Sequence, residues 1–294
     1  MSVVIPKFQI SAATQLGHLS LKVADLEEQT KFYTEVIGLE LLNQTNLTSI
    51  LGVDKQILLV LKKISNPLPI TKKTGLFHVA FLLPSRNDLG NALIHYLTNK
   101  APLIGASDHG YSEALYLNDP EGNGIEIYCD KDRKFWDIRP DGEIVGITVE
   151  LDGDNLIESA DGKWQGFPKG SKIGHVHLKV ADLQETELFY TRVLGLDLKT
   201  NYGDQAKFFA AGDYHHHIGS NIWLGRHTPA MVANDLGLDY YTFSVVNAQE
   251  LTRLEQHWQA ISANYLKETF DSLSILDPNG IKIKIQIEKN GLDA

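Results

Sequence analysis

The strongest constraint on this fold is a segment that occurs twice. Residues 17–42 read GHLSLKVADLEEQTKFYTEVIGLELL, and residues 174–199 read GHVHLKVADLQETELFYTRVLGLDLK. The two copies are identical at 16 of 26 positions, with a fixed offset of 157 residues (175 − 18). A repeat of this quality indicates duplicated structural units. We therefore expect a modular fold, in which comparing the copies shows where a reactive side chain is kept and where it is lost.

Each copy predicts a strand followed by a helix. Residues 18–23 of the first copy alternate in polarity, which is typical of a half-buried strand. Asp25 lies where a helix N-cap belongs, Glu28 follows as in a capping box, and Gly38 marks the helix end. Three strand-like runs follow, among them residues 56–62. The second copy has the same signals 157 positions later, so the unit is βαβββ.

Two weaker copies complete a pattern of four modules. Residues 75–81 align with residues 237–243, and each run leads into a helix-like segment and then a strand opened by Asp-Pro. The four modules, numbered 1 to 4, span about residues 14–66, 75–130, 172–226 and 237–288. The stretch 131–171 is rich in Asp, Gly, Pro and Trp and breaks the repeat. We therefore divide the chain into an N-terminal half (1–130), a linker (131–171) and a C-terminal half (172–294).

Composition limits the classes of function. The net charge of −10 and a pI near 5.5 argue against nucleic acid as a partner, because phosphate binding needs clusters of Lys and Arg. No apolar run approaches the ~18 residues that a membrane span requires, and the N-terminus lacks a signal-peptide pattern. The single cysteine, Cys129, excludes an intrachain disulfide and a cysteine-based metal cluster. We therefore expect a cytoplasmic protein with no membrane partner.

Module 2 carries a histidine and a carboxylate that module 4 lacks. His78 lies on the first strand of module 2, and Glu126 lies on its last strand, within DPEGNGIEIY. The matching positions in module 4 are Tyr240, or Tyr241 if the alignment shifts by one residue, and Lys284. Glu126 and Lys284 each follow the aspartate of their Asp-Pro pair by seven residues (126 − 119 and 284 − 277), so counting alone fixes this second match.

His18 and His175 occupy the matching first-strand positions of modules 1 and 3. Neutral imidazole is a good ligand for divalent transition metals, and a carboxylate adds charge. Two histidines and one carboxylate on one face leave coordination positions open, as in non-haem iron(II) oxygenases. A lone histidine on a strand is more often a packed core or rim residue, but the repeat-equivalent positions favour a metal site. Because Lys284 replaces the carboxylate in module 4, we expect one metal site and not two.

The repeated segment, together with DHGYSEALYLNDPEGNGIEIY at residues 108–128, resembles the vicinal oxygen chelate superfamily. It is most similar to extradiol ring-cleaving dioxygenases of the catechol 2,3-dioxygenase type. The resemblance covers almost the whole chain apart from residues 131–171 and the first dozen residues. Glyoxalase I, fosfomycin-resistance transferases and antibiotic-binding proteins share the module pattern, so it indicates the fold better than the reaction. It implies an α+β fold whose four βαβββ modules pair into two barrel-like halves.

The resemblance also implies roles for further residues. In the family a His-Gly precedes the last strands and a Tyr lies three residues before the Asp-Pro, and here these are His109 and Tyr116. Another histidine takes part in acid–base chemistry on the substrate and on oxygen. Within the run YHHHI at residues 214–218, His216 aligns best with that histidine. A histidine triplet is otherwise typical of a solvated loop or of weak adventitious metal binding.

Two pairings of the modules would complete the site differently. The family normally builds its site from modules 3 and 4, yet module 4 has lost its ligands here. Pairing modules 1 and 2 would place His18 beside His78 and Glu126, without the acid–base histidine. Pairing modules 2 and 3 would place His175 there and would bring the whole set together, so we favour this pairing. His177 shares a strand face with His175 and is the second choice as a ligand.

The implied function is an iron(II)-dependent extradiol dioxygenase that acts on a small, catechol-like aromatic diol and dioxygen. Mn(II) or another divalent metal is the alternative to iron. His216 would accept a proton from the diol, while His109 and Tyr116 would hydrogen-bond or protonate the developing oxyanions. The sequence is compatible with a homo-oligomer.

Two other functions are alternatives. Glyoxalase-type lyases or isomerases generally take a fourth protein ligand, a carboxylate at the end of the partner module's last strand. Residues 58–63 and 221–225, which end modules 1 and 3, contain no acidic residue. The other alternative is a metal-free protein that binds an aromatic compound, which would purify without metal and still bind its ligand.

Overall fold

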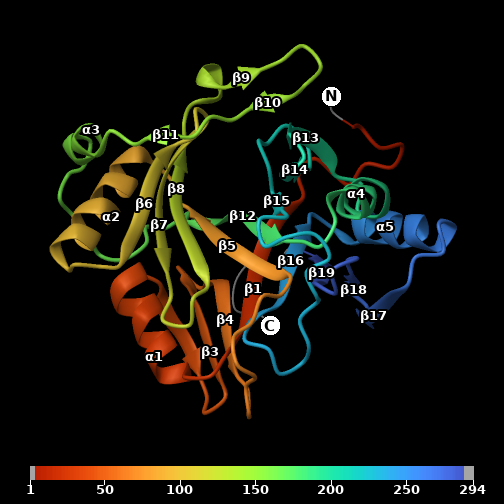
Figure 1. Cartoon of the computed structure of the whole chain (residues 1–294), viewed down its shortest axis with the longest axis horizontal. Helices are drawn as coiled ribbons and strands as arrows, with labels where there is room; N and C mark the ends of the chain where they lie inside the picture. Colours follow the sequence, from red (N-terminus) through yellow and green to blue (C-terminus); the bar gives the residue numbers. More distant parts are fainter. Residues whose placement is uncertain (1–3, 288–294) are drawn as a thin grey trace.

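Four modules follow one another along the chain, as the repeat predicts (Figure 1). The structure is a computed structural model that describes residues 4–287. Module 1 contains β1 (Gln15–Val23), α1 (Leu26–Lys31), η1 (Phe32–Ile37), β2 (Glu40–Gln44), β3 (Thr48–Val53) and β4 (Gln56–Lys63). Module 2 contains β5 (Gly75–Leu82), α2 (Arg86–Thr98), β6 (Leu103–Asp108), β7 (Ser112–Asn118) and β8 (Gly124–Asp130).

Modules 3 and 4 repeat this order. Module 3 contains β12 (Lys172–Lys179), α4 (Leu183–Leu188), η3 (Phe189–Val193), β13 (Asp197–Tyr202), β14 (Ala206–Ala210) and β15 (Ile218–Asn221). Module 4 contains β16 (Gly237–Val245), α5 (Ala248–Ala260), β17 (Tyr265–Thr269), β18 (Ser272–Leu276) and β19 (Lys282–Ile287). The elements η1 and η3 are π-helical turns that continue α1 and α4.

The strands form two large sheets, and each sheet joins modules from distant parts of the chain. β1 pairs with β16, so modules 1 and 4 form an eight-stranded sheet in the order β17-β18-β19-β16-β1-β4-β3-β2. β5 pairs with β12, so modules 2 and 3 form a nine-stranded sheet in the order β11-β6-β7-β8-β5-β12-β15-β14-β13. The structure therefore has the favoured pairing of modules 2 and 3. Within residues 4–287 neither sheet closes into a barrel, and the α+β fold consists of two barrel-like halves.

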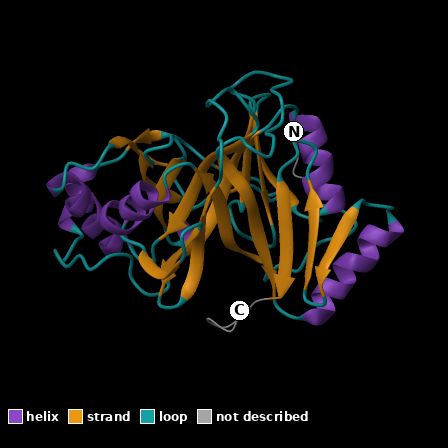
Figure 2. Ribbon diagram, turned by 90° about the horizontal axis from the view of Figure 1, so that it is seen from below, coloured by secondary structure: helices purple, strands orange, loops and turns teal. Residues whose placement is uncertain are grey.

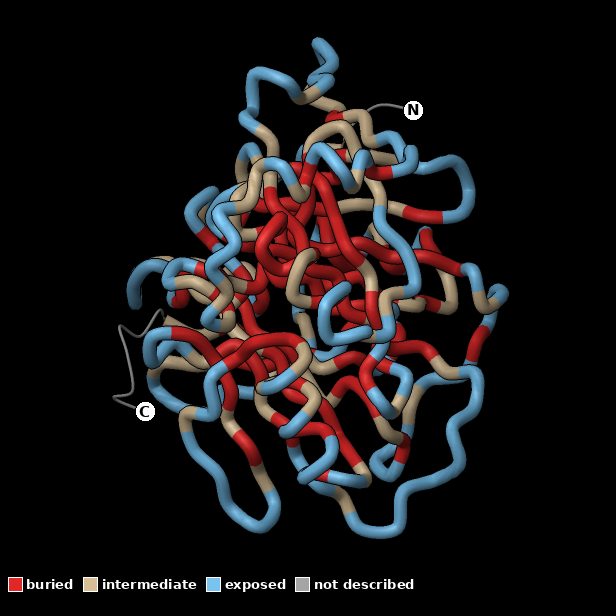
Figure 3. The backbone as a smooth tube through the Cα atoms, turned by 90° about the vertical axis from the view of Figure 1, so that its left-hand side faces the viewer, coloured by how far each residue is buried: buried red, intermediate tan, exposed pale blue. Residues whose placement is uncertain are grey.

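The helices lie on the outer sides of the molecule and the strands lie between them (Figure 2). Buried backbone fills the middle of the molecule, whereas the peripheral loops are exposed (Figure 3). Alternate apolar side chains along the strands are fully buried, such as Leu19 and Leu21 on β1 and Val79 and Phe81 on β5. Burying each such side chain contributes ~1.5–3 kcal/mol. Among the described residues, no helix has the length and apolar character needed to cross a membrane.

The predicted aspartate caps the first helix, but the capping box is completed differently. Asp25 accepts hydrogen bonds from the backbone N–H groups of Glu27 (3.1 Å) and Glu28 (3.0 Å), and Gly38 ends the helix with φ +102°. The backbone N–H of Asp25 donates to Glu121 of module 2 at 2.9 Å, and not to Glu28. This bond ties the helix of module 1 to a loop of module 2 across the two sheets.

The segment 131–171 is ordered and follows the outside of module 2. It contains η2 (Arg133–Phe135), β9 (Asp137–Ile138), β10 (Ile144–Val145), β11 (Val149–Glu150) and α3 (Gly153–Glu158). β11 pairs with β6 at one edge of the nine-stranded sheet, and α3 packs on α2. The ring of Trp164 stacks on His95 with their centroids 4.6 Å apart. The segment therefore extends the sheet that modules 2 and 3 share.

Candidate metal centre

Three neighbouring strands bring His78, Glu126 and His175 together. β5 carries His78 and lies between β8, which carries Glu126, and β12, which carries His175. Ala80 follows His78 on the same face of β5 and is paired with Glu126 on one side and His175 on the other. Because the Ala80 side chain is only a methyl group, the longer side chains on both flanks can converge above it.

Two glycines allow close packing around these strands. A Cβ atom on Gly124 would overlap the backbone carbonyl of Phe77, and one on Gly174 would overlap the hydroxyl of Tyr128. Tyr128 in turn lies against the ring of His175, with centroids 5.0 Å apart. The Gly-His pair at the start of the module 3 repeat therefore has a steric reason, because only glycine admits Tyr128 beside the histidine.

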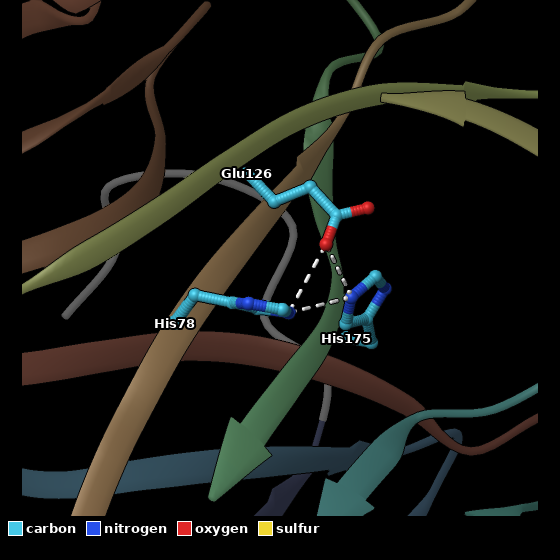
Figure 4. A group of neighbouring side chains, drawn as sticks. All are labelled: His78, Glu126 and His175. Carbon is cyan, nitrogen blue, oxygen red and sulfur yellow. Dashed lines mark hydrogen bonds and ion pairs between the residues drawn. The ribbon is translucent and has the colours of Figure 1, made fainter. Parts of the chain in front are cut away.

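The three ligand-type atoms form a compact, buried triangle (Figure 4). Nε2 of His78 lies 3.0 Å from Oε2 of Glu126, Nε2 of His175 lies 3.2 Å from the same oxygen, and the two nitrogens are 3.2 Å apart. With metal–ligand bonds of ~2.1 Å, ligand atoms at right angles would be ~3.0 Å apart, and ligand atoms at tetrahedral angles ~3.4 Å apart. The triangle matches one face of an octahedron better than three corners of a tetrahedron.

Burial and mutual contact set the charges of these groups. Burial lowers the pKa of His175 to about 4, against the attraction of Glu126, so the ring is neutral at pH 7 and can offer a lone pair. Burial alone would raise the pKa of Glu126, but the imidazoles of His175 and His78 hold it well below its usual range. Two imidazoles and a carboxylate are the donor set that suits divalent transition metals. These residues therefore fit a divalent ion in both charge and geometry.

The triangle lies in the wall of a cavity of about 690 Å³. Modules 2 and 3 supply most of the lining, and residues 146–148 of the intervening segment supply part of one wall. The cavity is also lined by the three residues for which the family resemblance implies acid–base or hydrogen-bonding roles, His109, Tyr116 and His216. The structure thus places all six favoured site residues around one space.

His109 and Tyr116 form a hydrogen-bonded pair. Nε2 of His109 lies 2.6 Å from the Tyr116 hydroxyl, and Nδ1 lies 2.9 Å from the carbonyl oxygen of Ile147. A carbonyl can only accept, so Nδ1 carries the proton, and in neutral His109 Nε2 accepts from the phenol. Burial raises the pKa of Tyr116, and the charge of Glu126 adds to this, so the phenol remains protonated.

The histidine triplet is buried and lies directly before β15, which excludes a solvated loop. The ring of His216 lies against that of His175, with centroids 4.2 Å apart. Nε2 of His215 lies 2.9 Å from Oδ1 of Asp130, and Nδ1 of His215 lies 2.8 Å from Nδ1 of His216. Because the carboxylate accepts from His215, a neutral His215 accepts at Nδ1 from His216. This chain leaves the lone pair of His216 on Nε2.

The two alternative ligands lie outside the triangle. His18 belongs to the other sheet, where its Nε2 lies 3.3 Å from the hydroxyl of Tyr240. Tyr240, and not Tyr241, is therefore the counterpart of His78. The ring of His177 is centred 5.0 Å from that of His78 and lines the cavity, but its buried Nε2 has no hydrogen-bond partner among the described residues.

Sequence reasoning missed Asp130 and the aromatic lining of the cavity. Asp130 follows Glu126 by four residues on β8, and residues four apart on a strand share a face, so the spacing contained a usable signal. Phe208 and Trp223 line the cavity from module 3, but an aromatic residue near a strand is equally typical of the core. Nothing in the sequence distinguishes these two side chains from packed ones.

Comparison with known proteins agrees with this architecture. Residues 15–127 and 172–285 match a family model described as the Glyoxalase/Bleomycin resistance protein/Dioxygenase superfamily. A Bacillus subtilis (strain 168) protein named catechol-2,3-dioxygenase is 43% identical over 273 residues, which is 90% of this chain and 94% of the relative.

Solved structures share the fold at low sequence identity. A crystal structure of a protein from Bacillus subtilis subsp. subtilis str. 168 has a TM-score of 0.65 and 14% identity, covering 97% of this chain and 87% of its own. Glyoxalase I from Zea mays has a TM-score of 0.58 and 15% identity, covering 94% and 92%. Since the family model spans both halves of the chain, and the catechol-2,3-dioxygenase relative spans most of it, this protein belongs to the glyoxalase/bleomycin resistance protein/dioxygenase superfamily.

Proposed function

We propose that this protein is a metal-dependent extradiol dioxygenase that cleaves a catechol-like diol with dioxygen. The observation that carries the proposal is the triangle of His78, Glu126 and His175, whose spacing fits one octahedral face and leaves the opposite positions to other ligands. The high identity to a protein named catechol-2,3-dioxygenase supports the same reaction. Iron(II) is the metal we propose, because two histidines and one carboxylate with open positions are typical of iron(II) oxygenases.

The protein's own part begins with holding the ion and the diol. An ion bound by the triangle would supply Lewis acidity and adjacent positions at which the two diol oxygens and dioxygen could meet. The three side chains come from neighbouring strands of one sheet, so their positions are fixed before substrate arrives. The walls of the cavity enclose the substrate, which reduces the contact of the reacting atoms with water.

In the proposed reaction His216 takes the proton that the diol loses. The chain from Asp130 through His215 holds its Nδ1–H, which leaves Nε2 as the accepting atom. Burial, together with the neighbouring His175, lowers the pKa of His216 well below its usual range, so the ring is uncharged before substrate binds. A low pKa also means that an accepted proton is readily returned. This suits a group that removes a proton early in the reaction and gives it back later.

In the proposed reaction Tyr116 and His109 stabilise negative charge on oxygen. In neutral His109 the phenolic proton of Tyr116 is engaged with Nε2. When His109 gains a proton, its Nε2–H donates to the phenolic oxygen instead, and the phenolic proton is free to turn towards an oxyanion in the cavity. Because Tyr116 stays protonated, it acts as a hydrogen-bond donor throughout.

A glyoxalase-type isomerase fits the site less well. The relevant relatives take a second carboxylate from the partner module, but β15, the last strand of module 3, contains none. Among the described residues, Glu126 is the one acidic side chain that lines the cavity. A metal-free binding protein, the other alternative, leaves the convergence of two histidines and a buried carboxylate without a purpose.

The reaction can be tested with protein purified without oxygen and loaded with iron(II). With catechol and air we expect oxygen uptake and a yellow ring-opened semialdehyde. Parallel loading with Mn(II) compares the two metals by the same measurement. No oxygen uptake with any of several catechols, combined with isomerisation of a ketoaldehyde–thiol adduct, would support glyoxalase chemistry instead. Absence of bound metal with retained binding of aromatic ligands would support the binding-protein alternative.

A further inference from the structure

The cavity is larger than the reacting diol requires. Its volume of about 690 Å³ lies within the range of ~300–1,000 Å³ that encloses drug-sized ligands, whereas the diol itself is one six-membered ring with two hydroxyls. The metal triangle and its acid–base partners occupy one part of the lining. The remaining space therefore has room for a substituent on the ring.

An unbroken series of ring contacts leads from the protein surface to the triangle. Trp223, which is 51% exposed, contacts His177 with ring centroids 5.4 Å apart. His177 contacts Phe208 at 5.6 Å, and Phe208 contacts His216 at 4.9 Å. His216 in turn lies 4.2 Å from His175. One wall of the cavity is thus a continuous aromatic surface from the solvent to the proposed metal ligands.

Large apolar side chains that water partly reaches gather in the lining of this same cavity. Ile104 and Tyr202 are 63% and 61% exposed, and Phe77, Ile147 and Trp223 are also exposed. Exposed apolar groups that cluster around a concave site are typical of a site for an apolar ligand. Ile104 lies on β6 and Ile147 in the intervening segment, whereas Tyr202 and Trp223 come from module 3. The occupant would therefore be held from two sides.

The charges of the lining disfavour an anionic substituent on the ring. Among residues 4–287, no lysine or arginine lines the cavity, and Glu126 is its one acidic residue. A carboxylate on the ring substituent would lose part of its hydration without gaining a lysine or arginine partner. Uncharged polar groups such as Ser107 and Thr148 could donate a hydrogen bond to a carboxylate but could not neutralise its full charge.

We propose that the physiological diol carries an extended, neutral, apolar substituent, and that carboxylated catechols are rejected. The substituent lies along the aromatic wall formed by Trp223, Phe208 and Phe77, whose ring centroid lies 5.0 Å from that of Trp223, and it extends towards solvent. This inference rests on the proposed dioxygenase function and names the substrate class of that site. Alkyl and aryl substituents share the required chemistry, and the experiment separates them.

The test compares catechols that differ only in the substituent. Oxygen uptake gives kcat/KM for catechol and for butyl- and phenyl-substituted catechols. It also gives kcat/KM for dihydroxyphenylacetate and for its neutral methyl ester. Each substituent is tested at ring position 3 and, separately, at ring position 4. We expect butyl- or phenylcatechol to exceed catechol by about tenfold or more, since each buried methylene contributes severalfold. We expect the acid to fall at least about 10²-fold below its ester, because its charge has no partner. Equal kcat/KM values for acid and ester would overturn the inference while leaving the dioxygenase function intact.

Variants locate the effect in this wall. Trp223→Ala should lower kcat/KM about tenfold more for the preferred substituted catechol than for catechol itself. Ile104→Arg adds the missing cation beside the cavity and should raise kcat/KM for the acid relative to the ester. Leu276→Arg is the matched control, because Leu276 is 60% exposed on β18 of the other sheet and should change neither ratio. An unchanged ratio in Trp223→Ala would contradict the assignment of the aromatic wall, and an unchanged ratio in Ile104→Arg would contradict the rejection of carboxylates for want of a cationic partner.

A binding measurement keeps the two proposals distinguishable. If no diol supports oxygen uptake, the proposed function fails, but calorimetry with the same ligands under anaerobic conditions still tests the cavity. Tight binding of butylcatechol with weak binding of dihydroxyphenylacetate would support the substrate class, and equal binding of the two would overturn it.

Discussion

The two sheets of this molecule share one architecture but differ at two of three equivalent positions. In the sheet of modules 2 and 3 these positions hold His78, Glu126 and His175, which converge. In the sheet of modules 1 and 4 the counterparts are Tyr240, Lys284 and His18, in the same order. The two sheets have the same backbone framework, so the framework alone does not create a metal centre. The metal centre depends on which donor atoms lie at these positions and on their charge.

The second sheet shows what replaces a metal at such a position. Nζ of Lys284 lies 4.1 Å from the ring centroid of Tyr240 and 3.3 Å from Oε2 of Glu268. Burial and, to a smaller extent, the positive charge of Lys284 together lower the pKa of His18 to about 4. The cationic side chain of Lys284 thus occupies the position that the carboxylate of Glu126 holds in the first sheet. A divalent ion would be repelled here.

The largest effect is expected from the carboxylate. Glu126→Ala removes the anionic ligand from the triangle and should abolish metal retention and oxygen uptake, because only the two imidazoles of the triangle remain. Lys284→Ala at the equivalent position of the other sheet is the matched control and should retain about one ion per chain. Metal content by atomic emission, with a thermal melt to check folding, compares the two. Full occupancy in Glu126→Ala would show that Glu126 is no ligand.

The two first-strand histidines should differ nearly as strongly. His175→Ala should lose most of its metal, since neither water nor a neighbouring side chain restores the imidazole geometry. His18→Ala should retain it, because His18 lies in the sheet with Lys284. Metal titration of both variants measures the difference. The opposite result, with metal lost only in His18→Ala, would show that the metal centre lies in the sheet of modules 1 and 4.

A separate effect is expected from the acid–base histidine. His216→Ala should keep its metal and its fold but lower kcat by ~10²–10⁴-fold, the contribution of a positioned acid–base group. Module 1 has no histidine after His18, so the second sheet has no equivalent group. Stopped-flow turnover, measured together with metal content, distinguishes a loss of catalysis from a loss of metal. If His216→Ala lost metal along with activity, His216 would have a structural or ligand role instead.

Local signals in the sequence predicted the four modules, and the structure gathers the six favoured site residues around one cavity. The helix cap at Asp25 and the helix end at Gly38 depend on nearby residues, so the chain itself encodes them. The comparison of repeats singled out His78 and Glu126 because the counterpart of Glu126 in module 4 is a lysine. These features need only short-range chemistry and a second copy for reference.

The rest depends on contacts between distant segments. Glu121 displaces Glu28 from the cap of Asp25 because a loop of module 2 folds against module 1, which no local pattern reports. The periodicity of strands is the same whichever modules pair, so both His18 and His175 were consistent with the sequence. The contribution of residues 146–148 to the cavity likewise follows from β11 joining the sheet edge.

The smallest effect should come from Asp130, which acts only through other side chains. Asp130→Asn keeps the shape and can still accept from His215, but it loses the charge that strengthens this bond, worth ~1.5 kcal/mol or roughly a tenfold fall in kcat. KM and metal content should not change, because Asp130 acts on the metal centre only through His215 and His216.

Nitrogen NMR of the histidine rings in Asp130→Asn should show a smaller fraction of His216 with the proton on Nδ1. In a His216→Ala background the same substitution should have no further effect on kcat, because the group it positions is absent. A full tenfold loss in that background would show that Asp130 acts on the reaction by another route.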